Sequence, residues 1–175
     1  MKVIFITTIL FLNILFLQSQ IVFKKYQVSN TPYAAYFPND PVDFEKSKSE
    51  DSLLIYTGSV FVEDTEYGLI MVDLTEDYMS QTKDEIQGLM EAYLDYLKTL
   101  FEVNYAKAYE KDLVLNNNKN AIGISDEWID GEGNTVLIKS WSDKDVIAVL
   151  FIIGDEMPDK ENQDIFLNGF VFVNQ

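Results

Sequence analysis

Short runs of β-branched and aromatic residues recur along most of the chain and predict strands. The predicted strands are Tyr33–Phe37, Leu53–Val62, Tyr67–Leu74, Asp112–Leu115, Ala121–Ile129, Thr135–Trp141, Asp145–Ile153 and Phe170–Val173. Within Asp145–Ile153 nearly every residue is apolar, so both faces of this strand require cover. We therefore predict that Asp145–Ile153 is the central strand of a sheet that is covered on both faces.

The segments between these runs carry residues that favour turns. Glu63–Glu66, Asn116–Asn120 and Asp130–Asn134 each predict a turn between two strands. The polar segment Asp43–Asp51 predicts a mobile connection. Phe37–Pro41 contains two prolines, which lack the N–H group that a strand ladder needs. We interpret it as the exit of the first strand, with a ligand-binding motif as the alternative.

Two segments have helical periodicity instead. The first begins with a capping box at Thr82–Glu85 and continues with apolar residues at three- and four-residue spacing to about Val103. Its apolar stripe consists of Ile86, Leu89, Met90, Tyr93, Leu94, Leu97, Leu100 and Phe101. Lys98 falls on the polar side, where a substitution is expected to change stability little. A shorter helix begins at Pro158 and ends at Gly169. Together the elements predict an α+β fold, a mostly antiparallel sheet flanked by a long helix and a shorter C-terminal helix.

Residues 1–20 have the layout of a secretory signal peptide: a basic start, a fifteen-residue apolar run over Val3–Leu17, then small and polar residues. An uncleaved anchor is the alternative, because Ile21–Phe23 resumes the apolar run. That run is shorter than the about 20 residues that a membrane span requires. We expect cleavage within Ser19–Val22, an exported protein in the periplasm or outside the cell, and a single domain over residues 21–175. The absence of cysteine excludes a lipid anchor on that residue.

The missing residue types exclude several kinds of chemistry. The chain has no Cys, His or Arg, so it offers no thiolate nucleophile, no serine–histidine–aspartate triad and no conventional zinc site. Its formal net charge of −16 repels nucleic acids and anionic membrane surfaces. The types of chemistry that these exclusions leave open are carboxylate catalysis, a serine–lysine pair and a metal bound by oxygen ligands. We predict no cofactor, and an enzyme is the secondary interpretation.

The order of the elements and two short motifs resemble the PsbP-like α/β/α sandwich superfamily. Tyr33–Pro41 is similar to the opening strand of that family with its Phe-Pro exit. Phe166–Phe170 is similar to its closing F-x-x-S-F motif, with Gly169 in place of Ser. The likeness extends over about Tyr33–Val173 and is greatest to small exported bacterial members of unassigned role. It implies protein partners more often than an enzymatic activity, and the fold alone does not fix a function.

The densest acidic segment, Asp126–Asn134, is a candidate calcium loop whose carboxylates are Asp126, Asp130 and Glu132. A calcium loop of the EF-hand type requires Gly at its sixth position and Glu at its twelfth. Counting from Asp126 places Leu137 at the twelfth position, and counting from Asp130 also fails. We therefore interpret the segment as a hairpin turn, with the three carboxylates as alternative metal ligands.

Two further groups of residues have simple explanations. The acidic cluster Asp155–Asp164 lies at the start of the shorter helix, where carboxylates stabilise a helix N-terminus. The adjacent Lys139 and Ser140 lack the S-x-x-K spacing of a serine–lysine dyad. The sequence therefore indicates no catalytic residue.

One side of the long helix is a candidate protein-binding surface. Tyr96 falls about 90° from the centre of the apolar stripe, with Leu89 and Val103 near it. Tyrosine is enriched at interfaces, although Tyr96 can also lie over the sheet edge with its hydroxyl in water. We expect an exported, non-catalytic module that binds a protein or peptide of the cell envelope through a sheet edge and this helix rim. The alternative is a small extracytoplasmic enzyme or calcium-dependent binder that uses acidic residues.

Overall fold

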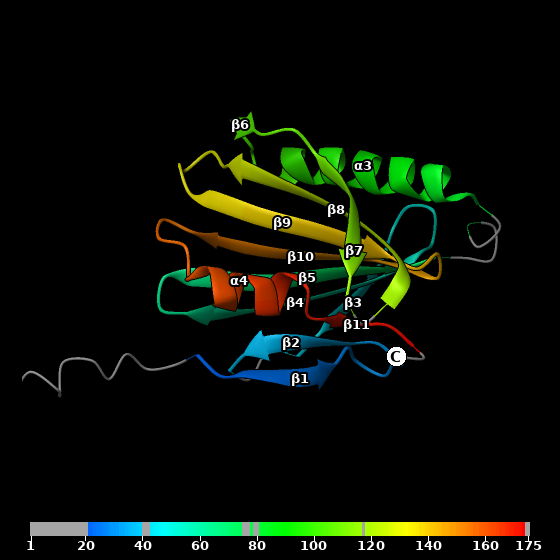
Figure 1. The fold of residues 1–175 in the computed structure, drawn as a ribbon, viewed down its shortest axis with the longest axis horizontal. Coiled ribbons are helices and arrows are strands. Elements are labelled where there is room, and N and C mark those ends of the chain that lie inside the picture. The colour runs from blue at the N-terminus through cyan, green and yellow to red at the C-terminus, as the bar shows by residue number, and fades with distance from the viewer. Residues whose placement is uncertain (1–20, 40–42, 75–77, 79–80, 117, 174–175) are drawn as a thin grey trace, which may run out of the picture.

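The structure is a computed structural model that describes residues 21–39, 43–74, 78, 81–116 and 118–173 (Figure 1). The larger of two antiparallel sheets contains β3 (Glu45–Lys48), β4 (Leu54–Val62), β5 (Thr65–Asp73), β6 (Tyr105–Ala106), β7 (Glu110–Leu115), β8 (Asn118–Ile129), β9 (Thr135–Ser142) and β10 (Val146–Gly154). Its order is β3–β4–β5–β10–β9–β8–β6, and β7 also pairs with β8. The smaller sheet contains β1 (Phe23–Gln27), β2 (Ala34–Pro38) and β11 (Phe170–Val171), in the order β1–β2–β11. With the helices α3 (Lys83–Leu100) and α4 (Lys160–Leu167), these sheets form an α+β fold.

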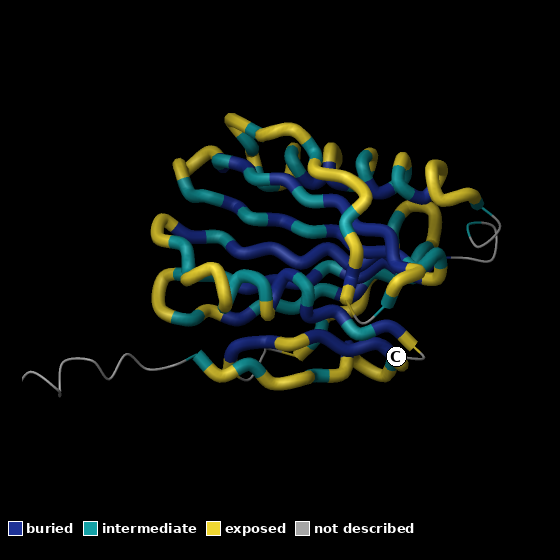
Figure 2. Tube along the Cα trace, in the orientation of Figure 1, coloured by how far each residue is buried: buried dark blue, intermediate teal, exposed yellow. Residues whose placement is uncertain are grey.

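The central position of β10 follows from its composition. β10 pairs with β5 on one side and β9 on the other, and its residues are buried almost throughout (Figure 2). Ile147 and Val149 face the core beneath α3. Ala148 and Leu150 face a second core beneath α4 and the smaller sheet. The prediction of a central strand covered on both faces is confirmed.

α3 begins where the sequence predicts and ends earlier. The Thr82 hydroxyl accepts a hydrogen bond from the Glu85 N–H, and the Glu85 carboxylate accepts one from the Thr82 N–H at 2.7 Å. The predicted capping box is therefore confirmed. The helix ends at Leu100 rather than near Val103, and Glu102 follows it in a left-handed conformation with a φ of 49°. The buried residues of α3 are Ile86, Met90, Leu94 and Leu97.

The smaller sheet is the main departure from the predicted arrangement, in which one sheet carries a helix on each face. β11 pairs with β2 and not with the larger sheet, and β1 forms a hairpin with β2. The sequence FKKYQ of β1 is mostly polar, so its strand depends on pairing rather than on an apolar pattern. β2 brings Phe37 against Phe166 of α4, with ring centroids 5.3 Å apart. The second face of the larger sheet is thus covered by α4 together with a sheet.

The polar segment Asp43–Asp51 contains a strand, so its prediction as a mobile connection is wrong. β3 pairs with β4 along Glu45–Lys48, and all four of its residues are exposed. An edge strand has a single neighbour and needs no apolar face, and charges along it discourage pairing with another chain. The two-residue strand β6 was missed because a pair of residues shows no periodicity.

Several predictions fall on residues outside the described part of the chain. The predicted signal peptide, residues 1–20, is one of them. β2 ends at Pro38, one residue beyond the predicted end at Phe37, and Pro41 lies in the stretch 40–42 that the structure does not describe. Among the described residues, the helices are too short or too polar to span a membrane.

Candidate functional site

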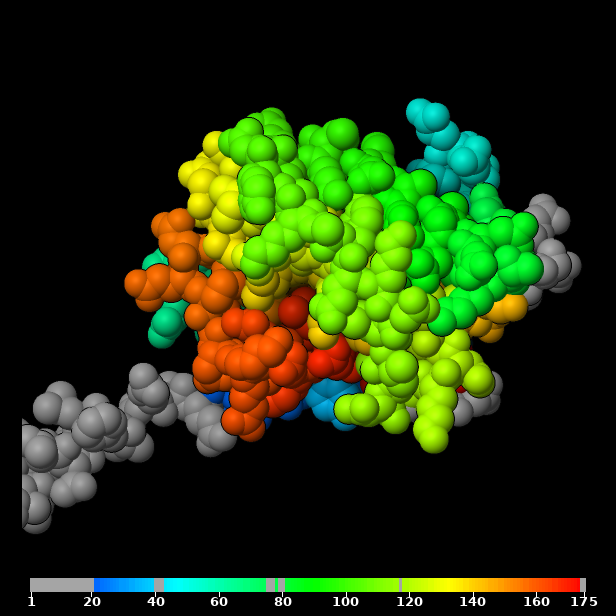
Figure 3. Space-filling view, turned by 45° about the horizontal axis from the view of Figure 1, so that its top comes forward, coloured from blue at the N-terminus to red at the C-terminus, as the bar shows by residue number. Residues whose placement is uncertain are grey.

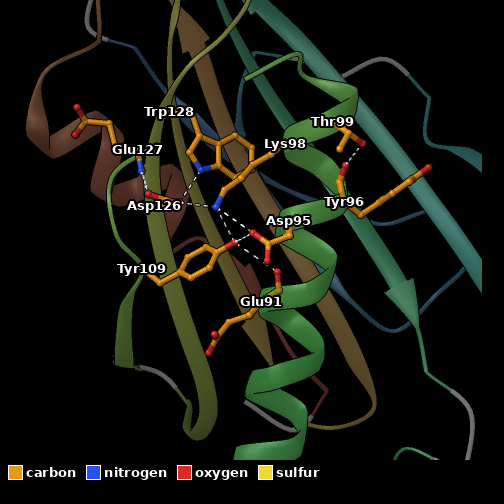
Figure 4. Close-up of polar contacts among 9 residues, drawn as sticks. All are labelled: Glu91, Asp95, Tyr96, Lys98, Thr99, Tyr109, Asp126, Glu127 and Trp128. Carbon is orange, nitrogen blue, oxygen red and sulfur yellow. Dashed lines mark hydrogen bonds and ion pairs between the residues drawn. The ribbon is translucent and has the colours of Figure 1, made fainter. Parts of the chain in front are cut away.

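A polar cluster joins α3 to β8 (Figure 4). Lys98 Nζ lies 3.1 Å from Asp95 Oδ1 and 3.3 Å from Asp126 Oδ2. It also donates a hydrogen bond to the Tyr109 hydroxyl at 2.9 Å, and Trp128 Nε1 donates one to Asp126 Oδ2 at 2.7 Å. We call these five residues the Lys98 cluster. The prediction that Lys98 lies on a freely substitutable polar side is wrong, because this side of α3 faces β8 and Tyr109.

The pKa shifts of three groups in the Lys98 cluster favour a charged Lys98, a neutral Tyr109 and an ionised Asp95. Burial opposes the charge of Lys98, but its hydrogen bonds to Tyr109 and Asp95 outweigh burial and hold its pKa above the ordinary value. Burial raises the pKa of Tyr109 to about 12. The hydrogen bond that Tyr109 donates to Asp95 at 2.6 Å lowers the pKa of that carboxyl. A charged lysine and a neutral phenol, both already hydrogen-bonded, tie the helix to the sheet, so we interpret the cluster as structural.

The carboxylates of the calcium hypothesis have separate partners. Asp126 is buried against Lys98. Burial opposes the charge of Asp130, but hydrogen bonds from the Asn134 side chain and from the N–H groups of Asn134 and Glu132 outweigh burial and lower its pKa. Asp130 thereby organises the predicted hairpin turn, where Glu132 is exposed. Within the described ranges, no three acidic side chains are grouped so that they could hold a metal ion.

Lys139 and Ser140 extend from opposite faces of β9, because side chains alternate along a strand. Ser140 is fully buried, and its hydroxyl has no hydrogen-bond partner among the described residues. Lys139 Nζ instead donates a hydrogen bond to Asn168 Oδ1, beyond the end of α4, at 2.9 Å. The two side chains therefore cannot act as a nucleophile and its base.

The side of α3 that faces away from the Lys98 cluster carries two exposed residues, Tyr96 and Leu100, beside the partly buried Leu89 and Tyr93. We call Leu89, Tyr93, Tyr96 and Leu100 the α3 rim, because their spacing of four, three and four places them on one side of the helix. Tyr96 is 55% and Leu100 60% exposed. The Tyr96 ring stacks on Tyr93 with centroids 6.2 Å apart and points away from the Lys98 cluster (Figure 4). Val103, predicted near Tyr96, lies beyond the end of α3 and packs against the core beneath it.

An acidic cavity of about 900 Å³ lies where the β4–β5 turn meets the loop between β10 and α4. The carboxylates that line it are Glu63, Asp64, Asp155, Glu156 and Asp159. The Thr65 hydroxyl donates a hydrogen bond to the Glu156 carbonyl at 3.4 Å and links the two segments. Asp159 caps α4, because its carboxylate accepts a hydrogen bond from the Asn162 N–H, and the helix therefore begins at Lys160 rather than at the predicted Pro158. The other four carboxylates of the cavity do not cap either described helix.

A third group of carboxylates lies at the opposite end of the larger sheet. The β9–β10 turn brings Asp143 and Asp145 near Asp73, the last residue of β5. Burial raises the pKa of Asp143 to about 6, and the charge of Asp145 adds to this effect. Burial and the charge of Asp145 also raise the pKa of Asp73.

Asp143→Asn is expected to stabilise the fold at neutral pH and to have no such effect at low pH. An unfolded aspartate titrates near about 3.9, below the folded value, so ionisation of Asp143 destabilises the folded chain as pH rises. Asparagine removes this charge and keeps an acceptor for the Asp145 N–H. Urea denaturation should show a stability difference that appears above about pH 4 and levels off beyond about pH 6. A difference that does not vary with pH would contradict this prediction.

Comparison with protein-family models and with curated proteins finds no match for the chain. Helical periodicity places Leu89 and Tyr96 on one side of α3 but indicates neither the Lys98 cluster nor the acidic cavity. Each of these two sites joins segments that are far apart in the chain, so no local spacing indicates it.

Proposed function

We propose that the protein is an exported, non-catalytic interaction module that binds a protein or peptide of the cell envelope through the α3 rim. The observation that carries the proposal is the adjacent exposure of Tyr96 and Leu100 on one side of a rigid, capped helix. Covering apolar surface gains about 25 cal/mol per Å², and tyrosine offers a large contact area with few rotatable bonds. An amphipathic segment laid along the helix would cover all four rim residues.

The sheet edges give less support to a binding function than the helix does. β3 presents an edge in which Glu45, Lys46 and Lys48 are exposed. Such charges oppose the addition of a further strand. The other side of β8 is already paired with β6 and β7. We therefore propose the α3 rim, without a sheet edge, as the binding surface.

The resemblance to the PsbP-like superfamily is part of this proposal. It is supported by an early strand that ends at Pro38, a long capped helix and the closing segment Phe166–Phe170. Export is supported by the signal-like layout of residues 1–20. The calcium-dependent alternative has less support, because Asp126 and Asp130 bind donors of the protein itself.

Tyr96→Ser is expected to abolish partner binding and to leave the melting temperature nearly unchanged, because the side chain is half exposed and packs on its helix neighbour. The measurement is chemical crosslinking in the envelope fraction, followed by mass spectrometry, together with a thermal melt. Tyr105→Ser is the matched control, because Tyr105 of β6 is 59% exposed and lies outside the rim. Capture that survives Tyr96→Ser, or crosslinks confined to the α4 face, would show that the rim is not the contact.

A further inference from the structure

We infer that the acidic cavity binds an extended polycation, a chain with several ammonium groups separated by methylene segments. The cavity lies at the end of the larger sheet where the β4–β5 turn and the β10–α4 loop meet. Figure 3 shows these two segments at the surface on the left of the view. The site is formed by residues other than those of the α3 rim, so the two proposals stand or fall separately.

The first observation that supports a cationic ligand is the negative charge of the cavity wall. Glu63, Asp64, Asp155 and Glu156 line the cavity, and no lysine among the residues that the structure describes does so. In the described part of the chain, none of these four carboxylates forms an ion pair or accepts a hydrogen bond. A concave surface lined by charges of one sign concentrates the electric field and attracts counter-ions. The cavity therefore selects for positive charge.

Tyr67 is the second and independent observation. It lines the cavity although it is only 1% exposed, and its hydroxyl has no hydrogen-bond partner among the residues that the structure describes. Burial raises the pKa of Tyr67 to about 12, with a further contribution from the charges of Asp159 and Glu63. The phenol therefore stays neutral. The Tyr67 oxygen is thus free to accept a hydrogen bond from an ammonium group in the cavity.

The spread of the charges distinguishes a polycation from a metal ion. A calcium ion needs six to eight oxygen ligands at about 2.3–2.6 Å, all within one coordination shell. No three of the described acidic side chains are grouped in this way. Val62, Met157 and Pro158 add apolar wall to the cavity, which suits methylene groups between charges. A volume of about 900 Å³ also exceeds the needs of a single ion and admits an extended chain.

The chemistry of such a ligand is shared by a free aliphatic polyamine and by a lysine-rich peptide. Isothermal titration of the protein at constant ionic strength should show that spermine binds at least about tenfold more tightly than butylamine or Ca²⁺. Tetralysine is the peptide probe. Tighter binding of tetralysine identifies a basic peptide as the source, and tighter binding of spermine identifies a free polyamine.

Two variants test the site itself. Glu63→Gln combined with Glu156→Gln should weaken spermine binding at least about tenfold, because each lost carboxylate removes a charge-assisted contact. Tyr67→Phe removes one hydrogen bond and should weaken it about fivefold, with the ring and its packing retained. A thermal melt of each variant confirms that it is folded.

Glu50→Gln combined with Asp51→Asn is the matched control, because it removes the same charge from exposed positions outside the cavity. This control should leave spermine affinity unchanged within about twofold, since distant surface charges are screened. Equal losses in the control and the cavity variant would show attraction by net charge alone and overturn the proposal. Ca²⁺ binding as tight as that of spermine, or an unchanged affinity in Tyr67→Phe, would also overturn it.

Discussion

Lys98→Met is expected to lower the free energy of unfolding by about 3–5 kcal/mol, the usual cost of removing one partner from a buried ion pair. The Asp126 side chain is fully buried, and Lys98 is its ion-pair partner. Without the lysine, this carboxylate keeps only the hydrogen bonds from Trp128 Nε1 and the Glu127 N–H. Methionine fills much of the space of the lysine stem, so the loss reports charge rather than packing. Urea denaturation measures the difference.

Lys107→Met is the matched control for this substitution. Lys107 pairs with Glu127 at 2.7 Å, but both side chains are substantially exposed, and surface pairs contribute little. Adding Asp126→Asn to Lys98→Met should restore part of the lost stability, because asparagine removes the unpaired charge and its one amide oxygen still accepts a hydrogen bond from either Trp128 Nε1 or the Glu127 N–H. Equal effects of the two lysine substitutions would show that the Lys98 cluster does not hold α3 to β8.

The elements with a strong local signal could be predicted from the sequence. Thr82–Glu85 marks the start of α3 because a capping box involves residues only three positions apart. The run that forms β10 marks the central strand because its residues require cover on both faces. Asp130 forms a turn because its carboxylate reaches the N–H groups two and four residues later. In each case the pattern that predicts the element lies within one short stretch of the sequence.

The arrangement of the smaller sheet could not be predicted in this way. Its formation depends on pairing Ala34 and Ala35 with Val171 and Phe170, more than a hundred residues later in the chain. No periodicity distinguishes this pairing from the addition of β11 to the larger sheet. β1 and β3 are mostly polar strands whose order comes from a neighbour, so an apolar pattern does not reveal them.

The two sides of α3 show the same limit at the level of a site. On a helical wheel, Lys98 and Tyr96 each lie roughly 100° from the centre of the buried residues, on opposite sides. Periodicity therefore gives both positions the same status, intermediate between core and solvent. β8 and Tyr109 cover the side of Lys98, and Tyr96 stays half exposed. The position of α3 on the sheet decides which side of the helix is covered. A helical wheel carries no information about that position.

Leu94→Asp is expected to abolish the folded state. Leu94 is fully buried between α3 and the sheet. Loss of its packing alone costs about 2–5 kcal/mol, and burial of a carboxylate without a partner adds several more. That sum approaches the about 5–15 kcal/mol by which a domain is stable. Circular dichroism should show loss of the cooperative thermal transition.

Ala92→Asp introduces the same residue at an exposed position two residues earlier in α3. Its cost should be below about 1 kcal/mol, because only helix propensity changes. Lys98 cannot serve as the control here, since its loss removes a buried ion pair and is itself expected to be destabilising. If Ala92→Asp and Leu94→Asp lower the transition temperature equally, α3 is not packed against the sheet through the side that carries Leu94. The Lys98 cluster and the α3 rim would then both lose the orientation of the helix on which they depend.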